Sequence, residues 1–127
     1  MDDSRTQPKT RVLMMPRDTN PAGTIFGGVI LSYIDQAGAE EARCHRAERV
    51  VTVAMKEVTF LQPVFVGDLV SFFTELVRVG KTSITVRVIV TAARGWDRNQ
   101  EAQVTEAEIT YVNIDADHQP TPLKPQT

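Results

Sequence analysis

The sequence of 127 residues has few of the residues that mark out several large classes of protein. It holds a single cysteine, Cys44, so no disulfide can form within the chain, and its two histidines are far apart. A lone thiol is typical of the reducing cytoplasm, and one cysteine with two distant histidines does not match the usual ligands of a zinc site. We therefore expect a cytoplasmic protein with no metal site.

Long hydrophobic runs and an excess of positive charge are also missing. The longest apolar stretch, residues 25–34, holds two glycines and a serine and is too short to span a bilayer. The N-terminus begins Met1-Asp2-Asp3, which is unlike a signal peptide. The 14 Lys and Arg residues against 16 Asp and Glu give a net charge of -2, with no basic stripe. We expect neither a membrane nor a nucleic-acid partner.

The length bounds the size of the fold. At 127 residues we expect one domain, residues 1–127, with a core at about 9–114 and an irregular tail at 115–127. A core of this size is marginal enough that assembly into an oligomer would help to stabilise it.

The most informative feature present is a glycine-rich loop that opens a nearly apolar helix. The loop covers residues 17–24, and the apolar spacing predicts a helix over 26–44, with Asp35 as the carboxylate in its apolar middle and Glu40, Glu41 and Arg43 marking its exit to water. A helix without a polar face belongs inside a protein. A carboxylate on such a helix has to be stabilised, neutralised or used in chemistry.

This helix has two predicted faces. The broad apolar face, which we expect to pack on a sheet, is formed by Val29, Ile30, Tyr33, Ile34 and Ala37. The opposite face is small, and we expect a second subunit or a ligand to cover it. It is formed by Gly28, Leu31, Asp35, Gly38, Ala39 and Ala42.

Elsewhere the apolar residues alternate with a period of two. The pattern predicts strands over 9–15, 50–61, 69–79, 82–91 and 103–114. Short connections between the last four strands favour antiparallel pairing. We therefore predict an α+β fold, in which a curved antiparallel β-sheet is wrapped around one central helix.

Short motifs along the chain resemble those of one family. They are Met15-Pro16-x-Asp18-Thr19-Asn20, Gly23-Thr24-Ile25-Phe26-Gly27-Gly28, Asp35, Val51-Thr52-Val53, Thr59-Phe60-Leu61-x-Pro63-Val64 and Val66-Gly67-Asp68. Over roughly residues 10–114 the chain resembles the hotdog-fold acyl-CoA thioesterases. The subgroup it resembles most is the short YciA-like bacterial acyl-CoA thioester hydrolases, which are related to the two-domain eukaryotic cytosolic acyl-CoA hydrolases.

The resemblance implies a fold, an assembly and a reaction. It implies the hotdog fold, a homodimer at least and often a trimer of dimers, or hexamer, with the active site in a groove between subunits. It implies hydrolysis of an acyl-CoA to a free carboxylic acid and CoA, with no cofactor because CoA is part of the substrate. In this family the helix carboxylate carries the chemistry, which assigns that role to Asp35.

One position departs from the family's commonest pattern. The residue before Ile25-Phe26-Gly27-Gly28 is often Asp or Asn in relatives, and in some it is a partner in catalysis. Here it is Thr24, which can hydrogen-bond a water or a carbonyl but cannot act as a base near neutral pH. This departure leaves Asp35 with the main role.

Elementary chemistry adds roles around Asp35. The carboxylate can activate a water as general base or attack the thioester as a nucleophile, and both roles stay open. The free N–H groups of Gly27 or, preferably, Gly28 at the helix N-terminus can polarise the thioester oxygen. Gly28 and Asp35 are seven residues, or about 10 Å, apart along a helix. We therefore expect Gly28 of one chain to act with Asp35 of its partner.

The phosphates of CoA need cations and small hydrogen-bond donors. The best candidates lie in one tight turn that resembles the segment holding the nucleotide end of CoA in the family. They are Arg78, Gly80, Lys81, Thr82 and Ser83. Asn20 and Thr59 are further candidates for lining the groove.

Each of these features also has a purely structural interpretation. Asp35 could be bonded to a backbone amide across a dimer seam, the glycines could serve helix–sheet packing, and residues 78–83 could form an ordinary hairpin. A hotdog hydratase is disfavoured, because no histidine on the helix is within reach of Asp35. The alternative function is a non-catalytic acyl-CoA-binding hotdog protein, which Thr24 keeps open.

Overall fold

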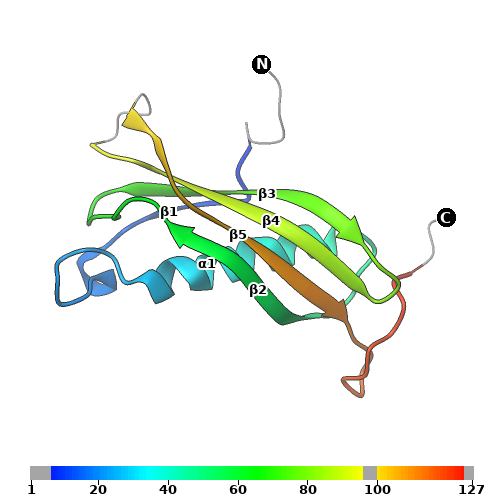
Figure 1. The fold of residues 1–127 in the computed structure, drawn as a ribbon. Helices are drawn as coiled ribbons and strands as arrows, with labels where there is room; N and C mark the ends of the chain where they lie inside the picture. The colour runs from blue at the N-terminus through cyan, green and yellow to red at the C-terminus, as the bar shows by residue number, and fades with distance from the viewer. Residues whose placement is uncertain (1–6, 96–99, 125–127) are drawn as a thin grey trace.

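The computed structural model describes residues 7–95 and 100–124, which form a curved five-stranded antiparallel sheet around one long helix (Figure 1). The elements in chain order are β1 (Thr10–Leu13), the short 3-10 helix η2 (Pro16–Asp18), α1 (Gly27–Arg43), β2 (Val50–Phe60), β3 (Leu69–Val79), β4 (Ser83–Ala93) and β5 (Ala102–Asn113). The strand order is β1-β3-β4-β5-β2. The expected α+β architecture is confirmed. Residues 125–127 of the expected tail lie outside the described residues.

The alternation of apolar residues locates the strands closely. Each strand begins and ends within two residues of its predicted limits, and β3 spans the predicted 69–79. The predicted inward row of β4 is buried, and it consists of Ile84, Val86, Val88 and Val90. This row packs with Ile30 and Ile34 of α1 in the core, so the sheet buries its concave face on the helix.

The faces of α1 differ from those predicted. The residues buried on this helix are Ile30, Ile34, Ala37, Gly38 and Ala42. The expectation that Gly38 and Ala42 lie on the opposite face is wrong, because the buried row follows the i, i+4 spacing of positions 30, 34, 38 and 42. The expectation of a helix without a polar face is also wrong. An exposed stripe runs along it through Gly28, Ser32, Gln36, Glu40 and Arg43.

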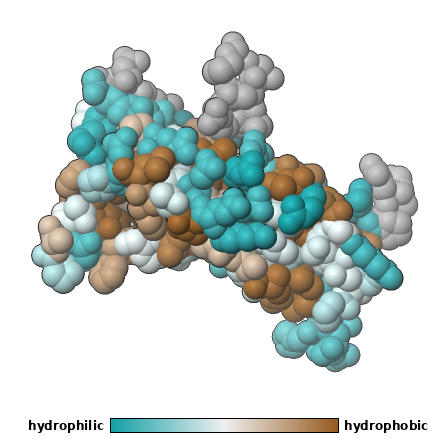
Figure 2. Space-filling model, viewed as in Figure 1, coloured by the Kyte–Doolittle hydropathy of each residue, from teal (hydrophilic) through white to brown (hydrophobic). Residues whose placement is uncertain are grey.

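Strand β2 lies at one edge of the sheet, and much of its apolar surface is uncovered in the single chain. Four apolar side chains on or beside it are between 41% and 59% exposed: Val51, Val53, Phe60 and Leu61. Figure 2 shows hydrophobic patches among polar areas on the face seen in Figure 1. Two β-bulges interrupt the pairing with β5, one between Thr52 and Ala54 and one between Lys56 and Thr59.

The start of α1 and the β3–β4 turn lie at opposite ends of the sheet (Figure 1). At one end, a Cβ on Gly27 would lie 3.6 Å from the Phe60 ring at the end of β2. At the other end, Ser83 pairs with Val112, and Val112 pairs with Val51 near the start of β2. From Val51 to Phe60 the strand covers roughly 30 Å, at about 3.3 Å a residue.

After β5 the chain folds back onto the β3–β4 turn. The buried Asn113 side chain donates to the carbonyl oxygens of Thr121 and Pro122 at 3.3 and 3.2 Å. The Leu123 N–H donates to the Lys81 carbonyl at 3.1 Å. These contacts hold residues 121–123 against the turn that contains the candidate CoA-binding residues.

Near the C-terminal end of α1, one carboxylate gathers three donors. Glu41 accepts hydrogen bonds from Thr74 Oγ1 at 2.8 Å and His45 Nε2 at 2.7 Å, and Lys9 Nζ lies 3.4 Å away. Burial alone would raise the pKa of Glu41, but the hydrogen bonds from His45 and Thr74 and the charge of Lys9 outweigh it, so the pKa is lowered. The ionised form of Glu41 is therefore the one that the fold favours.

Because the pKa of folded Glu41 is lowered, its contacts stabilise the protein above the carboxyl's ordinary value of 4.5, and this stability is lost as the pH falls through the folded pKa. We expect Glu41→Gln to be less stable than wild type near neutral pH and to lose less stability on acidification. Urea unfolding between about pH 7 and pH 3 measures this. Glu40→Gln, at the exposed preceding position, is the control. Parallel curves for wild type and Glu41→Gln would contradict the prediction.

Candidate active site

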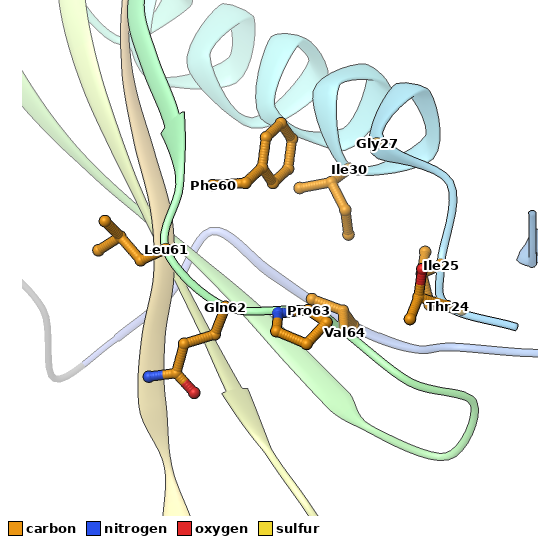
Figure 3. Close-up of a pocket in the computed structure, with 9 residues that line it drawn as sticks. All are labelled: Thr24, Ile25, Gly27, Ile30, Phe60, Leu61, Gln62, Pro63 and Val64. Carbon is orange, nitrogen blue, oxygen red and sulfur yellow. The ribbon is translucent and has the colours of Figure 1, made fainter. Parts of the chain in front are cut away.

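A groove of about 280 Å³ opens where α1 begins beside the end of β2 (Figure 3). One wall is formed by Thr24 and Ile25 of the loop before α1, with Gly27 and Ile30 of the helix. The other wall is formed by residues 60–64, from Phe60 at the end of β2 to Val64. Phe60 and Ile30 point toward one another across the groove (Figure 3). The groove is mostly apolar, with the Thr24 hydroxyl at its rim.

The loop before α1 is held in shape by the Asn20 side chain. Asn20 Oδ1 accepts hydrogen bonds from the N–H groups of Ala22 and Thr24 at 2.9 and 3.2 Å. Asn20 Nδ2 donates to Thr24 Oγ1 at 2.9 Å. The Thr24 hydroxyl therefore accepts from Asn20 and keeps its own proton to donate into the groove. Asn20, a candidate for substrate contact, here positions Thr24.

The first turn of α1 presents free backbone donors. Within residues 7–95 and 100–124, no protein acceptor receives a hydrogen bond from the N–H groups of Gly27 or Gly28. Such groups carry the positive end of the helix dipole and suit an oxygen that gains negative charge. Gly27 lines the groove, whereas Gly28 lines a more open depression of about 490 Å³ on the outer side of the helix, with Phe26 and Ser32.

Asp35 lies two turns further along α1, over the β2–β5 pair. Its Oδ1 accepts a hydrogen bond from Thr52 Oγ1 at 2.7 Å and lies 3.1 Å from the Tyr111 hydroxyl. Thr52 and Tyr111 are directly opposite each other in the β2–β5 register, next to a bulge in β2. Bulges are frequent beside functional sites, where they redirect side chains. The half-exposed Asp35 side chain is therefore held on one oxygen by two hydroxyls.

No cationic side chain in the described part of the chain lies within 4.0 Å of the Asp35 carboxylate. The charge is thus met by hydrogen bonds and not by an ion pair. Burial first, then the charge of Asp35 and its hydrogen bond, raise the pKa of Tyr111 far above its usual range. The Tyr111 hydroxyl therefore stays protonated and acts as a donor at any ordinary pH.

Within one protomer, the candidate residues do not all meet. Thr24 and Gly27 share the groove, but Asp35 is not among the residues that line it. Thr59 lines a separate pocket of about 360 Å³ with Glu57 and Glu106, on the other face of β2, because it precedes the inward-pointing Phe60. Residues 78–83 lie at the end of the sheet opposite the groove. Asp35 is nearer to this end than to the groove.

Two partners of Asp35, Thr52 and Tyr111, have no role in the sequence-based prediction. Thr52 stands within the motif Val51-Thr52-Val53, but its contact with Asp35 depends on where β2 crosses the helix. Tyr111 is 76 positions from Asp35 in the chain. The one local signal was Gly38, because a glycine inside a helix is unfavourable and often marks a close approach by another group.

The motif Val66-Gly67-Asp68 has a structural role. Asp68 is 1% exposed and accepts two hydrogen bonds from the Arg94 guanidinium, at 3.0 and 3.1 Å. It also accepts from the Phe65 N–H at 2.9 Å, and the Arg94 side chain lies over the Phe65 ring. Asp68 therefore ties the turn before β3 to the end of β4.

The described residues contain no cluster of three or more His, Cys, Asp or Glu side chains arranged to bind a metal. Across residues 7–95 and 100–124, no helix combines the length and the apolar character that a bilayer crossing requires.

Comparisons with known proteins agree with one another. A family profile described as "Thioesterase superfamily" matches residues 22–95. The acyl-CoA thioester hydrolase YciA of Salmonella typhimurium is 42% identical over 118 residues, which cover 91% of this chain and 89% of that protein. A hexameric hotdog fold thioesterase of Campylobacter jejuni has a TM-score of 0.85 and 49% identity, over 92% of this chain and 90% of that one. A hexameric broad specificity acyl-coenzyme A thioesterase has a TM-score of 0.87 and 34% identity, and the match covers 94% of this chain and 82% of that one.

Proposed function

This chain belongs to the thioesterase superfamily, and on that premise we infer that it is an acyl-CoA thioester hydrolase, which converts an acyl-CoA and water to a free carboxylic acid and CoA. The observation that carries the proposal is the partly buried carboxylate of Asp35, which accepts hydrogen bonds from two hydroxyls. A carboxylate in this setting is available for chemistry and is not used up in an ion pair.

Asp35 activates the attacking group in the proposed mechanism. As a general base it takes a proton from water while the water oxygen attacks the thioester carbon, and the proton then passes to the departing CoA sulfur. As a nucleophile it would attack the same carbon and expel the CoA thiolate, which leaves an acyl anhydride that water hydrolyses to the free acid and Asp35. Both routes break the carbon–sulfur bond and need no cofactor beyond the substrate itself.

The helix N-terminus stabilises the charge that develops on the thioester oxygen. We assign this role to the N–H of Gly28, with Gly27 beside it, because neither has a protein acceptor in the described residues. The Thr24 hydroxyl, which keeps a free proton, is a further donor at the groove. Removing one such donor from an enzyme typically lowers the rate by about 10²–10³.

The proposed site needs two protomers. Gly28 and Asp35 are about 10 Å apart along one helix, too far to act on one carbonyl carbon. Edge strand β2 carries the uncovered apolar residues Val51 and Val53, so a second copy pairing there would bury them and bring the two helices together. The solved relatives are hexameric, and we propose the same for this chain, as a trimer of dimers.

The β3–β4 turn is proposed to hold the nucleotide end of CoA. Arg78 and Lys81 supply positive charge, while Thr82 and Ser83 supply hydroxyls near the end of the sheet where Asp35 lies. A thioester at Asp35 of one protomer and Gly28 of the other would leave its CoA within reach of this turn. The single thiol of Cys44 fits the cytoplasm, where we propose that the enzyme works.

Release of the CoA thiol tests the proposal. The purified protein is incubated with acyl-CoAs of short, medium and long chain, and the free thiol is followed with a chromogenic thiol reagent. We expect release well above the rate without protein for at least one chain length, and the panel then gives the preference. Tight acyl-CoA binding without release at any length would favour the non-catalytic binding protein instead.

A further inference from the structure

The Asp35 carboxylate has a second hydrogen-bond partner, the buried Tyr111, which reaches it from the sheet. Tyr111 of β5 is 1% exposed, and its hydroxyl lies 2.8 Å from the Asp35 backbone carbonyl and 3.1 Å from Asp35 Oδ1. One hydroxyl thus touches both the main chain and the side chain of the same residue. A contact of this kind fixes where the carboxylate points relative to the helix.

Gly38 makes this contact possible. It lies one turn after Asp35 on the buried face of α1, and a Cβ at this position would come within 2.3 Å of the Tyr111 hydroxyl oxygen. The same Cβ would lie 3.2 and 3.3 Å from two ring atoms of Tyr111. Any other residue would push the hydroxyl away from Asp35. Glycine is a poor helix former, so its use here indicates that the close approach matters.

The geometry also distinguishes the two carboxylate oxygens. Thr52 donates to Oδ1, Tyr111 shares its one proton between Oδ1 and the Asp35 carbonyl, and no donor from the described residues reaches Oδ2. Oδ2 is therefore the oxygen left for a water or a thioester. Two hydroxyls on one oxygen leave the carboxylate little freedom to rotate.

We propose that Tyr111 is a positioning residue, which holds Asp35 so that Oδ2 faces the substrate, and that Gly38 is required because it leaves room for the Tyr111 hydroxyl. The proposal rests on the proposed function, since it assigns a reactive orientation to Asp35. Tyr111 itself does not touch substrate, because its side chain is buried beneath the helix.

The test compares two single-hydroxyl deletions. Tyr111→Phe removes the contact, and Tyr33→Phe, which alters the other tyrosine of the chain, is the matched control. We expect kcat of Tyr111→Phe to fall by about tenfold, because a loosened carboxylate spends less time in the productive orientation. We expect KM to stay within about twofold of wild type, because Tyr111 does not touch substrate and the loss falls on kcat. A purely structural tyrosine would change stability and leave kcat in place.

Gly38→Ala is a second way to break the contact between Tyr111 and Asp35. It should reproduce the loss of kcat with KM unchanged, and adding it to Tyr111→Phe should cause little further loss of kcat. Additive losses of kcat would show that the two residues act separately and would overturn the pairing. Should Tyr111→Phe be too unstable to purify, the kcat of Gly38→Ala at unchanged KM decides the proposal.

The outcomes separate the inference from the function it rests on. If wild type releases no CoA from any acyl-CoA, the proposed function fails. If wild type and Asp35→Asn release CoA equally, the hydrolase stands, but Asp35 leaves the mechanism and this inference fails with it. If Asp35→Asn is inactive while Tyr111→Phe matches Tyr33→Phe in kcat, only the role of Tyr111 is refuted.

Discussion

Asp35→Asn is expected to lower kcat by about 10²–10⁴, the range by which a positioned base or nucleophile contributes to a rate. The substitution keeps the size of the side chain and an oxygen that can accept from Thr52 Oγ1, now 2.7 Å from Asp35 Oδ1. The fold and the affinity for CoA should therefore survive. Thiol release under saturating acyl-CoA measures the loss, and calorimetric titration with CoA checks that binding remains.

The matched control for this variant is Glu40→Gln, which neutralises an exposed carboxylate on the same helix. It should leave kcat within about twofold of wild type, because an exposed charge has little effect on a distant reaction. Equal rates for wild type and Asp35→Asn would remove Asp35 from the mechanism.

Gly28→Pro is the second variant with a large expected effect, because proline deletes the N–H that we assign to the thioester oxygen. Proline is tolerated in the first turn of a helix, where the N–H has no partner in the helix, and Gly27 before it has no Cβ to clash with the ring. We expect kcat to fall by about 10²–10³ with the fold intact. Gly27→Pro, one position earlier, is the comparison, and a larger loss there would move the donor to Gly27.

The two inactive variants together test whether the site is shared. When Asp35→Asn and Gly28→Pro are coexpressed equally, random pairing makes half of the dimers mixed, and each mixed dimer has one intact site made of Gly28 and Asp35 from different chains. About a quarter of wild-type activity should then return. A site formed within a single protomer predicts no recovery, so this result would decide against the shared arrangement.

Local patterns predicted most of the fold. The alternation along β4 and the apolar spacing of α1 depend on nearby residues, so both could be recognised in the sequence. The side of the helix that faces the sheet could not be predicted in this way. Whether Gly38 lies against the sheet or away from it depends on where Tyr111 approaches the helix. Small residues suit either side of a helix, and only the large side chain opposite decides between them.

The site could be predicted only where it depends on local sequence. Asp35 stands out because it is a carboxylate among the apolar residues in the middle of the helix, whereas Thr52 reaches it only through the register of β2. The inward side of β2 includes Met55, Val58 and Phe60, a spacing that the two bulges make irregular. Simple alternation cannot be counted through such a strand, so the contact between Thr52 and Asp35 required the three-dimensional structure.

The irregular spacing of β2 also affects which extended peptides can pair with this exposed edge of the sheet. An open apolar strand is a template for any extended peptide, and regular strands can stack on one another without limit into fibrils. A regular extended peptide that pairs with β2 loses the register of its hydrogen bonds at the bulges, at 52–54 and again at 56–59. A second copy of this chain carries a strand with the same bulges. We therefore expect β2 to pair with that strand more readily than with an unrelated peptide, and to resist stacking into fibrils.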